Sequence, residues 1–323
     1  MRRVALLTGK TRGIGRPVSK ALLLAAMLAA LSPPAFAQTK MIVGLTQFNE
    51  VAPVMIAKEE GFFAKHGLDV TIQLIPLNSL MPAALQSDSI QIASLTPPVL
   101  LQAVDGGLDL IAVAGGAVGG KTDTNFGVVA RPEAGIKDAA DFAGKKVGVP
   151  GIGATLQVLF RKWLTVKGVD YNKVTFIETP FPQMPDMLKG GSVDAVVSAN
   201  PFMGRIIDGK IGNLVTNMAP DMPVGMASFF YSSTRDWATK HADAAKAFRE
   251  AIAEGVAFAG SNLDGARADF GKHVKLPPPV LATIVFTGLN AEPTVPSLAV
   301  WIDTMNEQKM LKTKVTAQNL ILP

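Results

Sequence analysis

The strongest constraint on the fold of this chain is an internal repeat, in which two stretches about one hundred residues apart carry matching residues in the same order. Val43 and Gly44 in the first copy correspond to Val147 and Gly148 in the second. The other matching groups are Gly67-Leu68-Asp69 with Gly168-Val169-Asp170, Val70-Thr71 with Val174-Thr175, Pro76 with Pro180, Met81-Pro82 with Met184-Pro185, Leu85 with Leu188, Ser89-Ile90 with Ser192-Val193, and Pro98 with Pro201. Because the order is shared and the offset is nearly constant, the sequence predicts two lobes with the same topology.

The pattern within each copy is typical of an α/β fold. Short apolar runs such as residues 41–45 and 146–149 are typical of buried strands, and amphipathic stretches such as residues 53–66 lie between such runs. Strands that alternate with helices at this spacing pair in parallel. We therefore expect two lobes, each a mostly parallel sheet flanked by helices, with a cleft between them.

The order of these segments also indicates how the lobes share the chain, whose 323 residues are enough for two modest cores. We expect residues 38–127 to form the first part of lobe 1 and residues 128–225 to form lobe 2. From Met226 onward the repeat ends and helical patterns soon dominate, so residues 226–323 are expected to return to lobe 1. Two crossing segments would then join the lobes.

Residues 1–37 have the three parts of a secretory signal peptide. A basic segment is followed by an apolar run over residues 21–31, and Ala35-Phe36-Ala37 forms an A-x-A cleavage site. The apolar run is shorter than the roughly 20 residues that a membrane-spanning helix needs. We expect cleavage after Ala37 and a periplasmic protein.

The charge of the chain is concentrated in this leader. Residues 1–37 hold six of the 31 basic residues and none of the 26 acidic ones, so the remainder carries 25 basic against 26 acidic residues. Nucleic-acid binding usually needs a basic face, so we expect no nucleic-acid partner. The chain has no cysteine, which fits an oxidising compartment.

One alternative lies inside the leader. The phrase TGKTRGIG over residues 8–15 has the glycine spacing of the cofactor loop of short-chain dehydrogenases. Such an enzyme also needs a tyrosine with a lysine four residues later, whereas Tyr171 is followed there by Thr175 and Tyr231 by Arg235. We interpret the phrase as part of the basic leader and keep a dehydrogenase as an alternative.

The phrase GKKVGVPGIGAT over residues 144–155 predicts a strand that turns through glycines directly into a helix. Backbone N–H groups at such a turn can hold an anion, although the glycines can equally serve only the tight turn. In open parallel sheets, ligands bind beyond the carboxyl ends of strands. The candidate binding residues are therefore Gln47, Phe48, Asn49, Ser94, Thr96 and Gly116 in the first lobe, Gly151, Ile152, Gly153, Ala154, Thr155, Phe181, Asn200 and Phe202 in the second, and Met226 in the returning segment. Lys121, Arg131 and Arg205 are nearby charged residues that could also reach a ligand.

Signatures of catalysis are absent from the sequence. His66, His241 and His273 each stand beside a lysine or glycine on a predicted polar face or helix end. The chain contains no H-E-x-x-H, no Cys-His pair and no G-x-S-x-G. We therefore expect no enzyme activity, no catalytic residue, no metal and no cofactor.

Three phrases resemble the periplasmic substrate-binding proteins of ABC importers. They are APVMIAKEEGFFAKHGLDV (52–70), VARPEAGIKDAADFAGKKVGVPGIGAT (129–155) and MLKGGSVDAVVSANP (187–201), and the resemblance extends from about residue 40 to about residue 250. The branch that they resemble takes nitrate, aliphatic sulfonates, taurine and a pyrimidine precursor of thiamine. The resemblance implies a type II-like, two-lobed binding fold that closes by hinge bending. It also implies a monomer that delivers its solute to a membrane permease with an ATPase.

The same resemblance implies ligand contacts at residues 47–49, 94–96 and 151–155 and at Asn200. We expect a small organic anion, either a sulfonate or an aromatic carboxylate. A sulfonate site is expected to show more hydroxyl groups or an arginine, whereas the turn over residues 151–154 and several phenylalanines are apolar, which leaves an aromatic carboxylate or a heterocycle open. Nitrate and a thiamine pyrimidine precursor are the alternatives. An enzyme on the same fold, such as a pyrimidine synthase, is the alternative of another class.

Overall fold

The computed structural model describes residues 38–221 and 223–323, and within them ten strands form two five-stranded sheets. The predicted signal peptide with its predicted cleavage site and the dehydrogenase-like phrase lie outside the described residues. The first sheet has the order β2 (Leu68–Leu74), β1 (Thr39–Leu45), β3 (Ile92–Leu95), β10 (Ala227–Thr234) and β4 (Leu110–Val118). The second has the order β7 (Thr175–Glu178), β6 (Lys146–Val149), β8 (Ala195–Ala199), β5 (Phe126–Ala130) and β9 (Asn213–Thr216).

The two sheets have the same construction. β1 pairs in parallel with β2 and β3, and β6 pairs in parallel with β7 and β8. The fourth strand of each sheet, β10 or β5, is antiparallel to both of its neighbours. The predicted α/β fold with mostly parallel sheets is confirmed, and the sequence repeat corresponds to a repeated topology.

The repeated glycine has a packing role in both sheets. Gly44 lies opposite Ala93, and Gly148 lies opposite Val196, so the two glycines hold equivalent positions. A Cβ atom on Gly44 would lie 2.7 Å from the Ile90 side chain. A Cβ atom on Gly148 would lie 2.9 Å from the Thr179 hydroxyl. In each sheet the glycine lets a neighbouring side chain pack directly over the strand.

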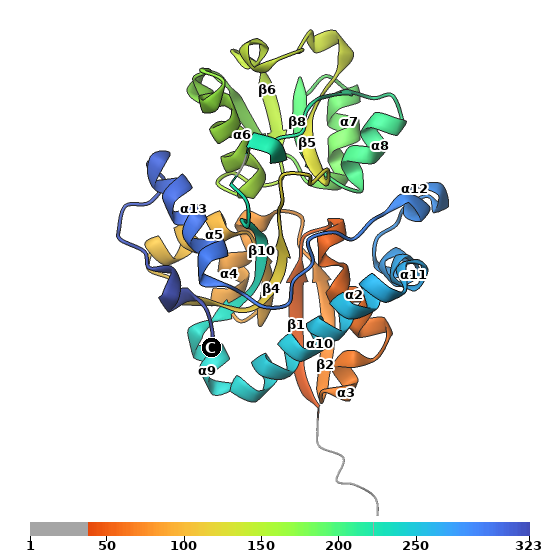
Figure 1. Cartoon of the computed structure of the whole chain (residues 1–323), viewed down its shortest axis with the longest axis vertical. Helices are drawn as coiled ribbons and strands as arrows, with labels where there is room; N and C mark the ends of the chain where they lie inside the picture. The colour runs from red at the N-terminus through yellow and green to blue at the C-terminus, as the bar shows by residue number, and fades with distance from the viewer. Residues whose placement is uncertain (1–37, 222) are drawn as a thin grey trace, which may run out of the picture. The chain divides into compact units, whose positions relative to one another are not determined.

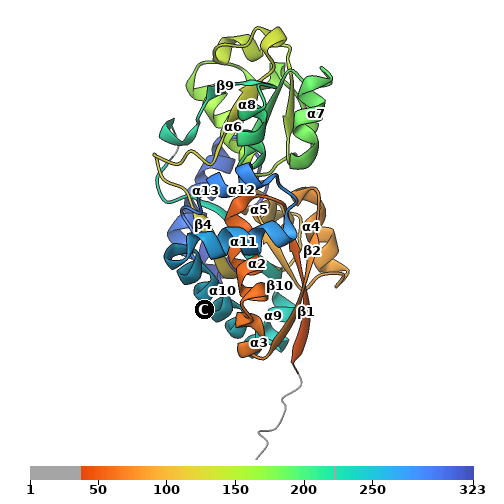
Figure 2. The ribbon, with the colours of Figure 1, turned by 90° about the vertical axis from the view of Figure 1, so that its right-hand side faces the viewer.

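Helices cover both faces of each sheet (Figure 1). Beside the first sheet, α2 (Ala52–Glu59) packs against α10 (Ala242–Ser261) and α11 (Leu263–His273), as Figure 2 shows, with α3 (Phe62–Lys65) next to them. Its other face carries α4 (Met81–Gln86), α5 (Pro97–Asp105) and α13 (Val295–Glu307). The second sheet lies between α6 (Thr155–Val166) and the pair α7 (Met184–Lys189) and α8 (Phe202–Asp208). The remaining α-helices of the described residues are the short α9 (Arg235–Lys240) and α12 (Pro278–Thr283).

One predicted helix differs from the structure. The sequence predicts a single helix over residues 53–66, whereas α2 ends at Glu59 and α3 begins at Phe62. Gly61 between them has φ of 74°, in the left-handed region that interrupts a right-handed helix. The apolar pattern continued across this glycine and concealed the break.

The chain crosses from the first sheet to the second between β4 and β5, and it returns between β9 and β10. The two crossing segments are bonded to each other. Gly119 N donates to Met226 O at 2.8 Å, and Gly225 N donates to Gly119 O at 3.2 Å. Among the helices of the described residues, none has the length and apolar character to cross a membrane.

Candidate ligand-binding site

A mostly apolar pocket lies between the elements of the two sheets. The empty space inside it, counted out to its mouth and including open solvent, is about 800 Å³. The first sheet and its helices supply Thr46, Phe48, Glu50, Asn78, Thr96, Ala227, Ser228 and Trp301. The second sheet, its helices and the crossing segments supply Gly119, Gly120, Phe126, Pro150, Ala154, Thr155, Leu156, Leu159, Phe181, Ala199, Ala219, Pro223 and Met226.

Six of the residues selected from the sequence line this pocket. They are Phe48, Thr96, Ala154, Thr155, Phe181 and Met226. Thr96 is fixed at the start of α5 by Asn78, whose Oδ1 accepts hydrogen bonds from Thr96 N at 3.0 Å and from Thr96 Oγ1 at 3.1 Å. Thr155 begins α6, and its Oγ1 donates to Ser228 O at 3.3 Å.

Other selected residues lie outside the lining. Ser94 is buried, and its Oγ accepts a hydrogen bond from Thr46 N at 3.2 Å. Gly116 is packed so that a Cβ atom would overlap the Phe229 ring. Phe202 stacks behind Phe181, with ring centroids 6.1 Å apart. The remaining four are Gln47, Gly151, Ile152 and Gly153, of which Ile152 is exposed.

Asn49 and Asn200 come together at a different place. Asn49 N donates to Asn200 O at 3.1 Å, and Asn49 Nδ2 donates to Val285 O at 2.9 Å. Both asparagines line a second pocket, which also contains residues of α12. Asn49 and Asn200, which the repeat places in opposite lobes, are thus in contact in the structure. Their contact lies outside the lining of the larger pocket.

Glu50 is the charged residue among the described lining residues that were not selected from the sequence. It lies in the 3₁₀ turn Asn49–Val51 between β1 and α2, is 6 % exposed, and accepts a hydrogen bond from Ser228 Oγ at 3.1 Å. Burial, with a smaller contribution from the Asp123 carboxylate, raises the pKa of Glu50 to about 8, against the lowering effect of the Ser228 hydrogen bond. The only signal in the sequence is an acid placed directly between a buried strand and an apolar helix.

Within the described residues, no lysine, arginine or histidine lines the larger pocket. Arg131 pairs instead with Asp194, Nη2 to Oδ1 at 2.7 Å. The Arg205 guanidinium lies 5.8 Å from the centre of the Phe202 ring. Asp123, beside the lining glycine Gly120, is partly buried, and burial raises the pKa of this second carboxyl group. The charged groups near the pocket are therefore acidic.

Aromatic rings from both sheets meet at the pocket. The Phe48 and Phe181 ring centroids are 6.4 Å apart, and Phe48 packs edge-on against Phe229 at 5.2 Å. Trp301 of α13 is held by a hydrogen bond from its Nε1 to Ala227 O at 2.8 Å. Rings fixed in this way suit a ligand with a flat apolar body.

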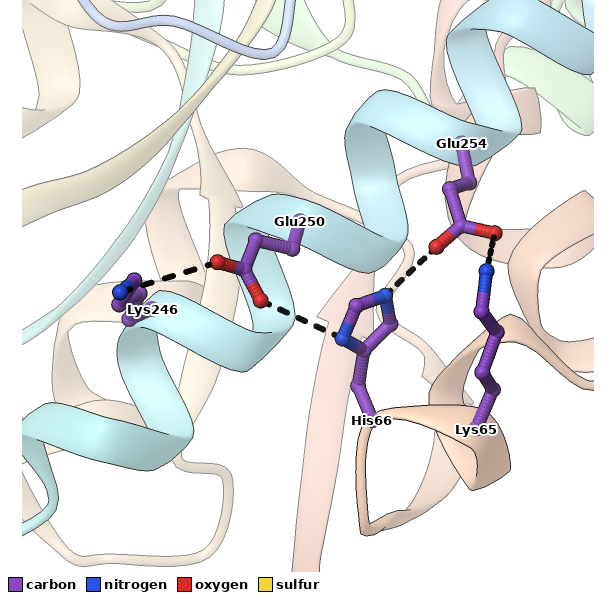
Figure 3. A network of polar contacts seen from close by, with 5 residues as sticks. All are labelled: Lys65, His66, Lys246, Glu250 and Glu254. Atoms are coloured by element: carbon purple, nitrogen blue, oxygen red, sulfur yellow. Dashed lines mark hydrogen bonds and ion pairs between the residues drawn. The ribbon is translucent and has the colours of Figure 1, made fainter.

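The histidines lie outside the pocket lining. His66 joins two glutamates of α10, with Nε2 2.6 Å from Glu254 Oε1 and Nδ1 3.3 Å from Glu250 Oε2 (Figure 3). His273 Nε2 lies 2.8 Å from Glu59 Oε1, and the His241 ring packs against Trp237. In the part of the chain that the structure describes, no group of three or more His, Asp or Glu side chains is arranged to hold a metal ion.

Residues 49–266 match the family described as "NMT1/THI5 like". The chain belongs to this family. The NMT1/THI5-like chain is 28 % identical over 254 residues to the "Nitrate/nitrite binding protein NrtA" of Nostoc sp., a match that covers 71 % of this chain and 56 % of the relative. It therefore spans little more than half the length of that relative. These findings confirm the predicted branch of binding proteins.

Solved structures establish the fold of the NMT1/THI5-like chain. The alkanesulfonate-binding protein SsuA from Xanthomonas axonopodis pv. citri superposes with a TM-score of 0.77 at 17 % identity, over 90 % of this chain and 99 % of that one. The nitrate-binding protein NrtA from Synechocystis PCC 6803 superposes with a TM-score of 0.72 at 18 % identity, over 87 % and 84 %. The fold is the two-lobed fold of periplasmic binding proteins, as predicted.

Proposed function

We propose that this chain is the solute-binding component of an ABC importer, which captures one small organic solute and catalyses nothing. The observation that carries the proposal is the pocket of about 800 Å³ whose walls come from both sheets. Its apolar rings and its buried carboxyl group, which accepts a hydrogen bond from Ser228, are suited to binding a solute. The relatives named above are known as binding proteins.

We further propose that the solute is held by closure of the two lobes. The sequence predicts lobe boundaries at residues 127/128 and 225/226, of which the first falls inside β5, so the first crossing segment lies just before Phe126. The crossing segments, bonded through Gly119 and Met226, would form the hinge. Contacts between the two bodies support a closed arrangement. Gln102 Nε2 of α5 donates to Gly153 O at 2.9 Å, and Ser79 Oγ donates to Glu178 Oε1 at 2.9 Å.

The lining favours some solutes over others. The sequence favours a sulfonate or an aromatic carboxylate, and the start of α6 at Thr155 offers backbone N–H groups that would suit an anion. Glu50 opposes this wherever its carboxyl group is ionised, because a second carboxylate or a nitrate beside it would then be repelled. The Phe48 and Phe181 rings favour an aromatic body, which also fits the alternative of a thiamine pyrimidine precursor.

The cellular setting belongs to the same proposal. We propose export to the periplasm, removal of the leader after Ala37, and delivery of the solute by a monomer to a membrane permease with its ATPase. Expression with the native leader in a Gram-negative host tests the first two points. We expect the protein in the periplasmic fraction with Gln38 as its first residue, and retention of the leader would contradict cleavage.

The function itself is tested by a thermal-shift screen of the purified protein over sulfonates, nitrate, aromatic carboxylates, pyrimidines and organic amines. Ligand-dependent stabilisation without turnover of the ligand is the expected result. Consumption of the stabilising compound, or reduction of a nicotinamide cofactor, would overturn the binding function in favour of a pyrimidine-synthase-like enzyme or a dehydrogenase.

A further inference from the structure

We infer that Glu50 makes this pocket selective for an organic cation: a flat, apolar body that carries a protonated nitrogen whose N–H groups face the Glu50 carboxylate. The inference rests on the proposed function, because it requires that the pocket holds a small solute. It goes further by assigning the chemical class of that solute and the residue that selects it.

The position of Glu50 provides the first step. Its side chain is buried in the protein and yet lines the pocket. Within residues 38–221 and 223–323, Ser228 is the one side chain that hydrogen-bonds this carboxyl group, through Oε1 at 3.1 Å. A carboxylate can accept several hydrogen bonds, so Glu50 can still receive donors from a molecule in the pocket.

The charge balance provides the second step. Within the described residues the lining contains no cationic side chain, and Asp123 adds a second carboxyl group that acts on Glu50. The start of α6 contributes only about half a positive charge. Burial of a carboxylate is costly unless a full positive charge pairs with it. A cationic ligand supplies the charge that the protein lacks.

The rings provide the third step. Phe48, Phe126, Phe181 and Trp301 line the same pocket as Glu50. Aromatic faces attract cations through the ring quadrupole, and they also bury a flat apolar body. Among the described lining residues, sulfonate and nitrate ions would meet no cationic side chain, and the polar groups beside Glu50 are neutral hydroxyls and one amide.

The proton balance follows from the pKa of Glu50, which burial raises to about 8. At neutral pH the empty pocket therefore holds mainly the protonated carboxyl group. When a cation binds, the carboxyl O–H bond breaks, the proton goes to solvent, and the carboxylate accepts the ligand N–H. Among the described residues the lining brings no other titratable side chain, and Asp123 is the titratable group that acts on Glu50. Affinity for a cation should thus rise as the pH approaches and passes 8.

Benzamidine and benzoate are suitable probes, because they have nearly the same shape and opposite charge. Titration calorimetry at about pH 6 and about pH 8.5, in two buffers of different ionisation enthalpy, measures affinity and proton release together. We expect benzamidine to bind roughly tenfold or more tightly at the higher pH, with up to about one proton released at neutral pH. Benzoate should bind more weakly than benzamidine both at about pH 6 and at about pH 8.5.

Two variants complete the experiment. Glu50→Gln keeps the shape of the side chain and should cost benzamidine at least about tenfold in affinity and remove its pH dependence. Glu133→Gln changes an exposed carboxylate in the 3₁₀ turn Pro132–Ala134 and should behave like the unaltered protein. Unchanged benzamidine binding by Glu50→Gln would overturn the inference.

The two proposals fail separately. If benzoate or a neutral pyrimidine binds more tightly than benzamidine at both pH values, the cation inference is wrong and the solute-binding function stands. If no compound in the wider thermal-shift screen binds, the solute-binding function fails as well.

Discussion

Glu178 of β7 in the second sheet accepts a hydrogen bond from Ser79, which lies in the 3₁₀ turn Asn78–Leu80 beside the first sheet, with 2.9 Å between Oε1 and Oγ. The same Glu178 oxygen accepts from Ile152 N at 2.8 Å. Glu178 thus fixes the glycine turn of its own sheet and holds a residue of the other body. This pair is a contact that opening of the pocket would break.

We expect Ser79→Ala to shorten the lifetime of the complex with ligand. The substitution removes the bond between the two bodies and leaves the Ile152 bond intact. A net loss of about 0.5–1.5 kcal/mol corresponds to a roughly 2- to 12-fold faster dissociation. Stopped-flow fluorescence measures it, because Trp301 lines the pocket. Ser87→Ala is the matched control, since within the described residues Ser87 Oγ hydrogen-bonds only to Ala84 O and Ser89 Oγ, both near α4. Equal dissociation rates for the two variants would show that the contact does not hold the lobes closed.

The fold was largely predictable because the repeat carries backbone information. Gly44 and Gly148 occupy equivalent places in parallel sheets, and Gly67 and Gly168 share left-handed φ values of 73° and 76°. Positions of this kind depend on local geometry, so they are visible in a single sequence. The antiparallel strand in each sheet comes from a distant part of the chain, and the repeat alone did not reveal it.

The site was less predictable, because topology places a residue at the end of a strand but does not fix the direction of its side chain. Ser94 lies near the carboxyl end of its strand, as the topology predicts, yet its hydroxyl oxygen already accepts a hydrogen bond from Thr46 N. The Asn49 side chain donates a hydrogen bond to the carbonyl oxygen of Val285, which lies 236 residues later in the sequence. Glu50 accepts a hydrogen bond from Ser228, 178 residues later in the sequence, a contact that no local pattern reveals.

Thr155→Val should weaken ligand binding with little effect on folding. The Thr155 hydroxyl lines the pocket at the start of α6, and its hydrogen bond to Ser228 O is long, at 3.3 Å. Valine keeps the branched shape and removes the polar group, so we expect a loss of roughly 3- to 10-fold in affinity. Calorimetry with the best ligand of the screen checks this. An affinity equal to that of the unaltered protein would mean that the hydroxyl does not contact the solute.

Asn200→Leu should lower the stability of the fold and leave ligand affinity unchanged, which is the opposite of the result expected for Thr155→Val. Asn200 Oδ1 accepts a hydrogen bond from Gly204 N of α8 at 3.2 Å, and the residue lines the second pocket rather than the larger one. We expect the free energy of unfolding to fall by about 1 kcal/mol and ligand affinity to stay the same. Denaturant unfolding and calorimetry measure the two quantities. A loss of affinity with intact stability would place Asn200 at the ligand after all.

The cluster of Figure 3 predicts a loss of stability in acid. Hydrogen bonds from Lys65 and His66 hold the pKa of Glu254 below its ordinary value of 4.5. A carboxyl group with a lowered native pKa stabilises the fold above its unfolded value, and this contribution is lost as the pH falls through the native value.

Glu254→Gln should therefore lower Tm by roughly 1–3 °C near pH 6 and have no effect near pH 3. Thermal unfolding across this range is the measurement, with Glu133→Gln as the exposed control. A difference between Glu254→Gln and the unaltered protein that persists unchanged at pH 3 would contradict the role of this ionised carboxylate.

Glu50 predicts the opposite dependence in the ligand-free protein. Its native pKa of about 8 lies above the ordinary 4.5, so the folded state binds more protons than the unfolded state between these values. Stability should then fall as the pH rises from about 4.5 to about 8. Glu50→Gln cannot ionise and should escape this loss, gaining on the order of 3 kcal/mol over the unaltered protein near pH 8 and little near pH 4.5. Denaturant unfolding of both proteins at the two pH values measures the gain. If Glu50→Gln is less stable than the unaltered protein near pH 8, the Glu50 carboxylate is already paired within the chain. The pocket would then hold no unpaired negative charge for a cation to neutralise.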